Sequence, residues 1–309
     1  MTSLQSTRID WKSVVDRVKL ELAWFQERDI TPTLRTLFYR LVSLEAIPNT
    51  NQAYKQLSSA CVKARKKGKL PWNSITDEGR LILADFEEEY QTPEQYVQLH
   101  IDLLKEASQN YIVPRWHKQP HYVEVWIEKQ ALADTFSSCL KGRDVRIVVN
   151  KGYSGWSFLY KNCMRLLEMK EIGKEIHILY FGDFDPSGDD IDDHLDDALR
   201  FFGLGDIDFQ RIAVTEDQIE EFNLPPMSKS KETINKINHD RRKNGFIRKY
   251  GKLYTVELDA LLAIVPDEFK SIVQESVDQF FDQEVYQDVL SGHQPQLVDR
   301  LVRERVRFD

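Results

Sequence analysis

The sequence is poor in cysteine, and it lacks long apolar runs. Its three cysteines, Cys61, Cys139 and Cys163, form no CxxC pair and have no histidine partner pattern. We therefore expect reduced thiols, and neither a disulfide nor a zinc site. No stretch approaches the roughly 18 apolar residues that a membrane helix needs, and residues 1–8 lack the apolar core of a signal peptide. These absences predict a protein that stays in the cytoplasm or with the nucleoid, without a membrane partner.

An excess of positive charge is also missing. The chain has 42 Lys and Arg against 50 Asp and Glu, which gives a net charge of −8. Contact with a polyanion must therefore come from local basic patches rather than from the average field. The chain of 309 residues is 41% hydrophobic and 11% aromatic, which is enough for a buried core in one large domain or two ordinary ones.

Three helices are predicted near the N-terminus. Residues 10–28 place apolar side chains at helical spacing. Thr31 suits the cap, and Pro32 the first position, of a helix that runs to about Leu44. A third helix is expected from Asn51 to Lys66, ending at Gly68 before a basic loop. Helix, short turn, helix and basic loop are typical of a winged helix-turn-helix domain.

Five positive charges lie at the end of the third predicted helix and in the loop after it: Lys63, Arg65, Lys66, Lys67 and Lys69. Solvated surface is the ordinary explanation of such a run. In a helix-turn-helix domain, however, the second helix and the wing face the duplex, where Lys and Arg neutralise phosphates. We therefore predict that these residues bind double-stranded DNA, together with Lys151 at the end of the second predicted strand.

A second domain is expected after an irregular segment at 109–120. Residues 81–107 look helical and acidic, and the boundary is placed so that the domains are 1–110 and 111–309. The second domain alternates strands near 122–127, 145–149, 176–181 and 209–214 with helices near 130–140, 155–170 and 188–202. This alternation predicts an α/β domain with a mainly parallel four-stranded sheet flanked by helices.

Three carboxylates are expected at one edge of this sheet. Glu128 follows the first predicted strand, and Asp183 and Asp185 follow the third, two residues apart and so on one face. Ligands bind outside the carboxyl ends of parallel strands, and hard oxygen ligands suit magnesium. The simpler alternatives are that the aspartates cap the next helix and that Glu128 pairs with Lys129. Because adjacent anions are costly without a compensating cation, we predict Mg²⁺ on Glu128, Asp183 and Asp185.

These residues resemble a known family. Strand-Glu128, the glycine turn at Gly152 and Asp183-x-Asp185-x-x-Gly188 look like the Toprim domain of topoisomerases, primases and some nucleases. In that domain the glutamate and the two aspartates bind magnesium and handle a phosphodiester. A winged helix followed by a Toprim domain is similar to the A subunit of topoisomerase VI and to the meiotic double-strand-break protein. The resemblance covers roughly 32–281, including a match at 257–261.

The resemblance implies a catalytic tyrosine. In that family, the second helix carries an Arg-Asp-x-Tyr-Tyr-like motif whose last tyrosine attacks DNA. Arg35 and Tyr39 match it, whereas Thr36 replaces the acid and Phe38 replaces the first tyrosine. Without the resemblance, Tyr39 is most simply a core aromatic residue. A phenol with a pKa of about 10 needs a nearby cation to act as a nucleophile, and Arg35 is the nearest candidate.

The resemblance further implies type IIB DNA cleavage by transesterification. Tyr39 would become linked to a 5′ phosphate, Mg²⁺ would neutralise charge on the phosphate, and Glu128 would act as general acid or base. A homodimer is implied, with Tyr39 of one protomer beside the metal site of the other. The chain has no Walker-type motif, so strand passage would need a separate ATPase B-type subunit. Two alternatives remain: a Toprim nuclease that uses metal-activated water, and a non-catalytic DNA-binding module.

Overall fold

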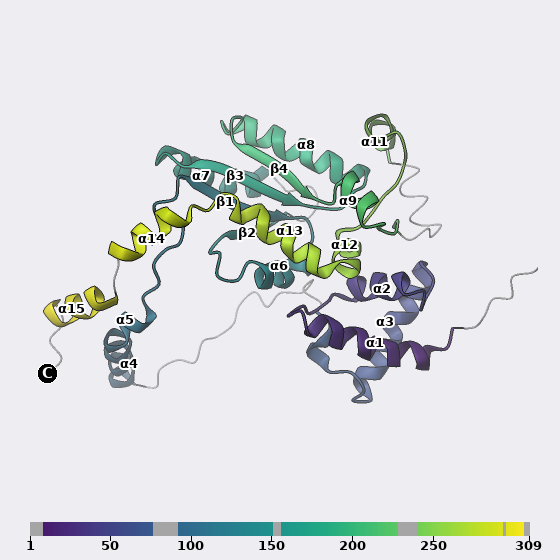
Figure 1. The fold of residues 1–309 in the computed structure, drawn as a ribbon, viewed down its shortest axis with the longest axis horizontal. Coiled ribbons are helices and arrows are strands. Elements are labelled where there is room, and N and C mark those ends of the chain that lie inside the picture. The colour runs from purple at the N-terminus through teal and green to yellow at the C-terminus, as the bar shows by residue number, and fades with distance from the viewer. Residues whose placement is uncertain (1–8, 77–91, 151–155, 228–239, 293–294, 306–309) are drawn as a thin grey trace, which may run out of the picture.

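The computed structural model of the chain describes residues 9–76, 92–150, 156–227, 240–292 and 295–305. An α-rich N-terminal region lies beside a four-stranded parallel sheet that is flanked by helices (Figure 1). The predicted α/β class is therefore confirmed at this level. No helix among the described residues has both the length and the apolar character needed to cross a membrane.

The N-terminal region contains the three predicted helices: α1 (Trp11–Gln26), α2 (Leu34–Ser43) and α3 (Asn51–Lys66). The predicted start of α2 is wrong by two residues, because Thr33 rather than Thr31 is the N-cap and its side chain accepts a hydrogen bond from the Thr36 amide. Pro32 lies before the cap, and its carbonyl accepts a hydrogen bond from Thr76 at 3.0 Å.

The end of α3 is as predicted. Gly68 has a φ of 66°, a left-handed conformation that glycine adopts without strain, and the next amide, of Lys69, donates to the carbonyl of Ala64. A short 3-10 helix, η1 (Trp72–Ser74), follows. Within residues 9–76 the strand pairing is a single bridge between Thr33 and Thr76, so no β-hairpin wing forms in this part of the chain.

All four predicted strands are present: β1 (His121–Ile127), β2 (Arg146–Val149), β3 (Glu175–Phe181) and β4 (Asp208–Ala213). Their order is β2-β1-β3-β4, and every neighbouring pair is parallel. The helices between them are η2 (Gln130–Leu132) with α6 (Ala133–Cys139), α7 (Trp156–Glu171) and α8 (Pro186–Phe201). The predicted βαβ alternation is therefore confirmed.

Successive residues of each strand pack into different layers. Trp126 and Tyr180 face a core formed with α7 and α8, whereas Val125, Ile127 and Phe181 face a second core on the other side. This second core includes α6, α12 (Leu258–Ile264) and α13 (Pro266–Asp278). The sheet is thus covered on both faces, as expected of parallel strands. Two shorter helices, α9 (Glu216–Glu221) and α11 (Lys243–Tyr250), lie after β4.

Helix α12 joins the N-terminal helices to the sheet. Its residues from Leu258 to Ala263 are all buried, and the helix packs against α2. Leu37, Phe38 and Leu41 of α2 are also completely buried, and they belong to the same continuous core as the sheet. Each such side chain contributes about 1.5–3 kcal/mol on burial. The apolar core therefore fixes α2 above one edge of the sheet.

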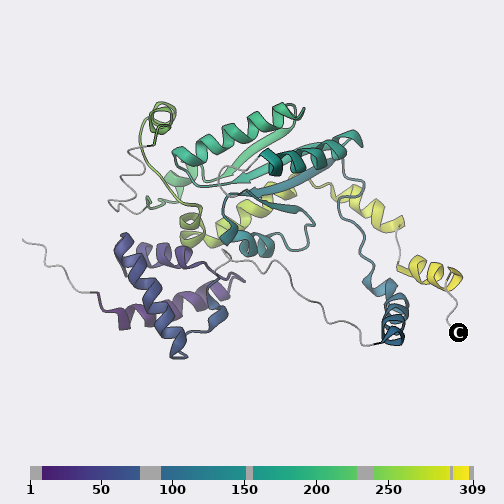
Figure 2. The same ribbon diagram turned by 180° about the vertical axis from the view of Figure 1, so that it is seen from behind.

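Four further helices lie away from this core: α4 (Pro93–Lys105), α5 (Ala107–Asn110), α14 (Gln283–Gly292) and α15 (Pro295–Arg305). Helices α4 and α5 pack beside α15 and are separated from α1–α3 (Figures 1 and 2). The helix expected at 81–107 is confirmed from Pro93 to Lys105, where Thr92 and Gln95 form a capping box. Residues 81–91 lie outside the described residues.

Candidate active site at the carboxyl edge of the sheet

The three predicted carboxylates lie at the carboxyl ends of β1 and β3. Glu128 directly follows β1, and its Oε2 accepts a hydrogen bond of 2.9 Å from the Asp183 amide. Asp183 Oδ1 accepts a hydrogen bond of 2.8 Å from the Leu258 amide. Asp185 is the N-cap of α8 and accepts a 2.6 Å hydrogen bond from the Gly188 amide. The capping alternative thus holds for Asp185, while Asp183 connects β3 to α12.

Two glycines allow this close packing. A Cβ atom on Gly188 would lie 2.2 Å from the carbonyl oxygen of Asp183. A Cβ atom on Gly182 would lie 2.9 Å from Glu128 Oε2 and 2.8 Å from the hydroxyl of Tyr180. The contact at Gly188 is with backbone, so the turn that carries the aspartates depends on glycine there. At position 182, a larger residue would displace the side chains of Tyr180 and Glu128.

Negative charge at this edge is incompletely compensated. Burial raises the pKa of Glu128, and the charge of Asp185 raises it further. Burial also raises the pKa of Asp183, although the charge of Lys129 opposes this shift. Burial raises the pKa of Asp185 as well, against the effect of its backbone hydrogen bonds. A set of hard oxygen donors with excess negative charge fits a divalent cation such as Mg²⁺. The oxygens of the three carboxylates are not gathered as closely as the ligands of a bound ion. Among the described residues, the group whose ligand atoms all lie within 4.8 Å of one another is His121, Glu175 and His177.

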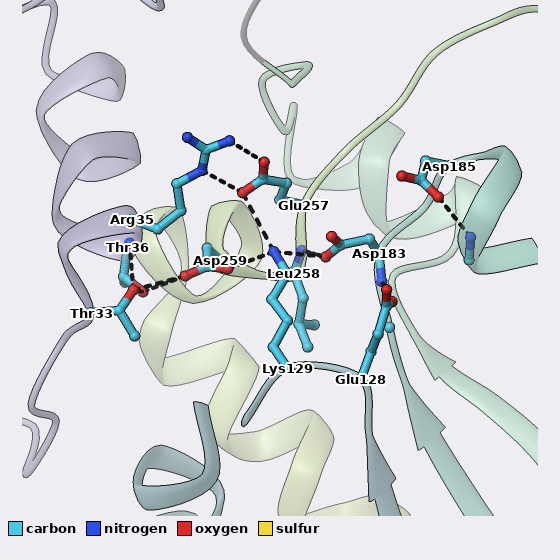
Figure 3. A network of polar contacts seen from close by, with 12 residues as sticks. Thr33, Arg35, Thr36, Glu128, Lys129, Asp183, Asp185, Glu257, Leu258 and Asp259 are labelled. Atoms are coloured by element: carbon cyan, nitrogen blue, oxygen red, sulfur yellow. Dashed lines mark hydrogen bonds and ion pairs between the residues drawn. The ribbon is translucent and has the colours of Figure 1, made fainter. Parts of the chain in front are cut away.

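Lys129 lies at the centre of a buried ionic network (Figure 3). Its Nζ is 2.8 Å from Asp259 Oδ2, 3.0 Å from Asp183 Oδ1 and 3.4 Å from Glu257 Oε2. Burial alone would lower the pKa of Lys129, but the charges of these carboxylates outweigh it and raise the pKa well above its usual value. The ammonium thus holds Asp183 of the sheet against two carboxylates at the start of α12.

The same two carboxylates bind α2. Asp259 Oδ1 accepts hydrogen bonds from the hydroxyls of Thr33, at 2.9 Å, and Thr36, at 3.0 Å. Glu257 forms a bidentate ion pair with Arg35, in which Nε donates to Oε2 at 2.6 Å. Thr36, which stands where the motif in the sequence comparison has an acid, therefore has a role here, because an acid at this position would place a second carboxylate against Asp259.

Tyr39 lies in the core. It is completely buried, and its hydroxyl has no hydrogen-bond partner among the described residues. The guanidinium carbon of Arg35 lies 5.5 Å from the centre of its ring. Burial and the charge of Glu257 raise the pKa of the Tyr39 hydroxyl, although Arg35 and Lys129 oppose this shift. In this conformation the residue is a core aromatic, and its role as a nucleophile stays a prediction.

A cleft of about 780 Å³ separates α2 and α3 from the acidic edge. Its lining includes Arg35, Tyr54, Arg65, Glu128, Lys129 and Glu257, whereas Tyr39 does not line it. Tyr54 of α3 is the tyrosine in this cleft, with the Arg35 guanidinium carbon 5.0 Å from its ring centre. The cleft thus combines cationic and anionic side chains from both parts of the chain.

Sequence reasoning missed Tyr54, and it gave no role to Lys129, Glu257 or Asp259. The sequence marks these residues only weakly. Lys129 directly follows Glu128, which suggests a surface ion pair between the two, and Glu257 and Asp259 stand out only through the motif match at 257–261. The partly buried Lys129 pairs instead with the three carboxylates around it.

The predicted DNA-binding residues differ in their surroundings. The four lysines of the set, Lys63, Lys66, Lys67 and Lys69, are exposed and can reach a phosphate. Arg65 is partly buried, lines the cleft, and donates a 2.9 Å hydrogen bond to the carbonyl of Ile75. Lys151 lies outside the described residues.

The fold and the site define the class: an α/β protein with a parallel four-stranded sheet, helices on both faces and buried carboxylates at the carboxyl edge. Comparison of the chain with protein-family models, with curated proteins and with solved structures gave no match. The Toprim resemblance therefore rests on the motifs of the sequence.

Proposed function

We propose that this protein cleaves phosphodiester bonds of double-stranded DNA in a reaction that depends on Mg²⁺. The observation that carries the proposal is a group of three carboxylates with raised pKa values, Glu128, Asp183 and Asp185. Of these, Glu128 lines the cleft together with Arg35 and Arg65. Bound Mg²⁺ would neutralise charge on the phosphate that reacts. The arginines and exposed lysines supply the local positive charge that the net charge of the chain does not.

Water is the nucleophile that the geometry favours. Tyr39 is buried outside the cleft and its hydroxyl has a raised pKa, whereas Glu128 lines the cleft and its raised pKa makes it a better base. Water would add to phosphorus as Glu128 takes its proton, one bond from phosphorus to a sugar oxygen would break, and the proton would pass from Glu128 through solvent to that oxygen. The products are a phosphate monoester and a hydroxyl.

Transesterification by Tyr39, as in type IIB topoisomerases, is the second candidate. The observation in its favour is the buried hydroxyl of Tyr39 without a partner, since such a group costs about 1–3 kcal/mol. A shift of α2 that exposed Tyr39 beside Arg35 would relieve this cost. This candidate includes a homodimer and a separate ATPase subunit.

A homodimer is also supported by the outer helices. Helix α4 has no buried residue, and the large apolar side chains exposed on α4 and α15 are Tyr96, Val97, Leu103, Leu104, Leu297 and Leu301. Sedimentation equilibrium would measure the mass of the particle. A monomer at micromolar concentration would remove this part of the proposal.

A plasmid assay tests the reaction and its nucleophile. Supercoiled DNA is incubated with protein and Mg²⁺, and the reaction is stopped with denaturant. Hydrolysis predicts free DNA ends, at least about a 100-fold loss of rate in Glu128→Gln, and retained activity in Tyr39→Phe. Transesterification predicts a covalent protein–DNA adduct that Tyr39→Phe abolishes.

Asp206→Asn, which alters a surface ion pair with Lys170, is the matched control and should cleave as the wild type does. Salt-dependent binding of DNA without cleavage would leave only the non-catalytic DNA-binding module. Cleavage that persists in Glu128→Gln and after removal of Mg²⁺ would refute the proposed site.

A further inference from the structure

A second cluster of ligand atoms lies at the opposite edge of the sheet. His121 begins β1, Glu175 begins β3, and His177 follows two residues later. The parallel register pairs His121 with Glu175 and His177 with Asp208, the first residue of β4. The amino ends of the three strands therefore bring together four side chains from three separate segments of the sequence.

The distances in this cluster match those in a metal site. His121 Nδ1 lies 3.0 Å from His177 Nε2 and 3.3 Å from Glu175 Oε2, and the three ligand atoms all lie within 4.8 Å of one another. In a tetrahedral zinc site with bonds of about 2.0–2.1 Å, ligand atoms are about 3.3 Å apart. One ion could therefore join the three side chains with only small movements.

Neighbouring groups orient the two imidazoles. Asp208 Oδ2 lies 2.9 Å from His177 Nδ1, so this nitrogen carries the proton and the lone pair of Nε2 points toward His121. A carboxylate on the far nitrogen is the usual support of a metal-binding histidine. Phe280 stacks on the ring of His177 at 3.9 Å and contacts His121 edge-on. Both rings are thus held in place without the ion.

We propose that His121, Glu175 and His177 bind one divalent transition-metal ion of the zinc class. Two imidazoles and a carboxylate suit zinc, whereas magnesium prefers oxygen ligands. The side chains of His121 and Glu175 are 27% and 71% exposed, so solvent can reach the ion and supply a water ligand. The ion links β1 to β3, and Asp208 extends the support to β4, so the site stabilises the sheet.

This site is distinct from the acidic edge in position and in ligand chemistry. The cysteines and their spacing give no sign of this site, because its two histidines are 56 residues apart and meet only through strand pairing. Without a metal, the same contacts form a hydrogen-bonded pair of histidines between two carboxylates.

Metal titration of the full chain tests the proposal. The protein is freed of metal, and zinc is added in competition with a chromophoric chelator, with cobalt absorbance as a spectroscopic check of the coordination. The wild type should bind one equivalent, and a large excess of Mg²⁺ should not displace it. His121→Asn should bind at least about tenfold more weakly. Asp208→Asn, which weakens the support of His177 and changes the acceptor for the Gln210 amide, should bind about 10–100-fold more weakly.

Two further variants keep the test independent of folding. Glu175→Gln changes a largely exposed side chain, so it should keep the wild-type circular dichroism spectrum but lose zinc affinity and the rise in unfolding temperature that zinc produces. His100→Asn, an exposed histidine of α4, should bind zinc as the wild type does. Absence of zinc binding in the wild type, or binding that is unchanged in the His121 and Glu175 variants, would overturn the proposal.

Discussion

Replacement of Lys129 by methionine should disrupt the ionic network that joins α2 to the sheet. Methionine keeps an unbranched side chain of similar length but removes the ammonium. Asp183, Glu257 and Asp259 would then remain as buried carboxylates without the cation that lies 2.8–3.4 Å from each of them. Arg35 would still pair with Glu257, but the charges of Asp183 and Asp259 would lose their cationic partner.

The magnitude follows from the burial of the partners. One pair of charges about 3 Å apart attracts by about 5–6 kcal/mol at an effective dielectric constant of about 20, and the desolvation of the ammonium cancels much of this. Removing one partner of a buried pair typically costs about 3–5 kcal/mol. We expect Lys129→Met to lower the free energy of unfolding by this amount. The side chain of Asp259 is only 3% exposed, so solvent screens the loss weakly.

Equilibrium unfolding in urea measures this loss of stability. The urea concentration at the midpoint should fall, while the dependence of the unfolding free energy on urea concentration stays the same. Lys170→Met is the matched control, because Lys170 pairs with Asp206 at 2.5 Å on the surface, and its loss should cost at most about 1 kcal/mol. Adding Asp259→Asn to Lys129→Met should recover part of the stability. If both lysine variants lose the same small amount, the network does not hold α2 to the sheet and the reasoning fails.

Three further experiments test other parts of the structure. Gly188→Ala forces a Cβ atom against the carbonyl of Asp183, so it should lower the free energy of unfolding by about 1–3 kcal/mol in a thermal melt and abolish DNA cleavage. Gly245→Ala, in open space on α11, is the control and should be neutral or stabilising. Burial of Asp259 opposes its ionisation, but Lys129 and the threonine hydroxyls outweigh this effect and lower its pKa. The ionised carboxylate therefore contributes to stability above about pH 4, and this contribution is lost as the pH falls through the lowered pKa. The difference in unfolding free energy between wild type and Asp259→Asn should therefore be constant near neutrality and shrink in acid. Replacing the four exposed lysines of the basic segment with glutamine should weaken DNA binding and reduce its salt dependence. These lysines are Lys63, Lys66, Lys67 and Lys69.

Each of these expectations can fail in a defined way. Equal stability of the two glycine variants would show that the turn before α8 relaxes easily. A difference between wild type and Asp259→Asn that grows in acid would mean that the carboxyl is neutral in the folded protein. An unchanged salt slope in the lysine variant would place the DNA-binding surface elsewhere.

The strands, the helices and the acidic edge could be predicted from local patterns. Strand ends are marked by short-range signals, and the carboxyl ends of parallel strands must lie at one edge, so Glu128 and Asp183 were expected to be neighbours. The cap of α2 could not be settled in the same way, since Thr31 and Thr33 are both good capping residues and the contact between Pro32 and Thr76 selects the second.

The surroundings of Tyr39 show the limit of motif reasoning. A motif gives the identity of a residue and its spacing, but not its exposure, which depends on what packs over it. Here α12, more than two hundred residues later in the chain, packs on α2, and Tyr39 belongs to the resulting core. Tyr54, which no motif marked, lines the cleft instead.

The sequence by itself determined the α/β class, the parallel alternation and the position of three carboxylates, because each depends on residues close together in the chain. Only the tertiary structure decided which charges meet. Lys129 joins carboxylates from β3 and α12, and His121 meets His177 across a strand pair. Such contacts depend on long-range packing and on strand register, which local periodicity does not encode.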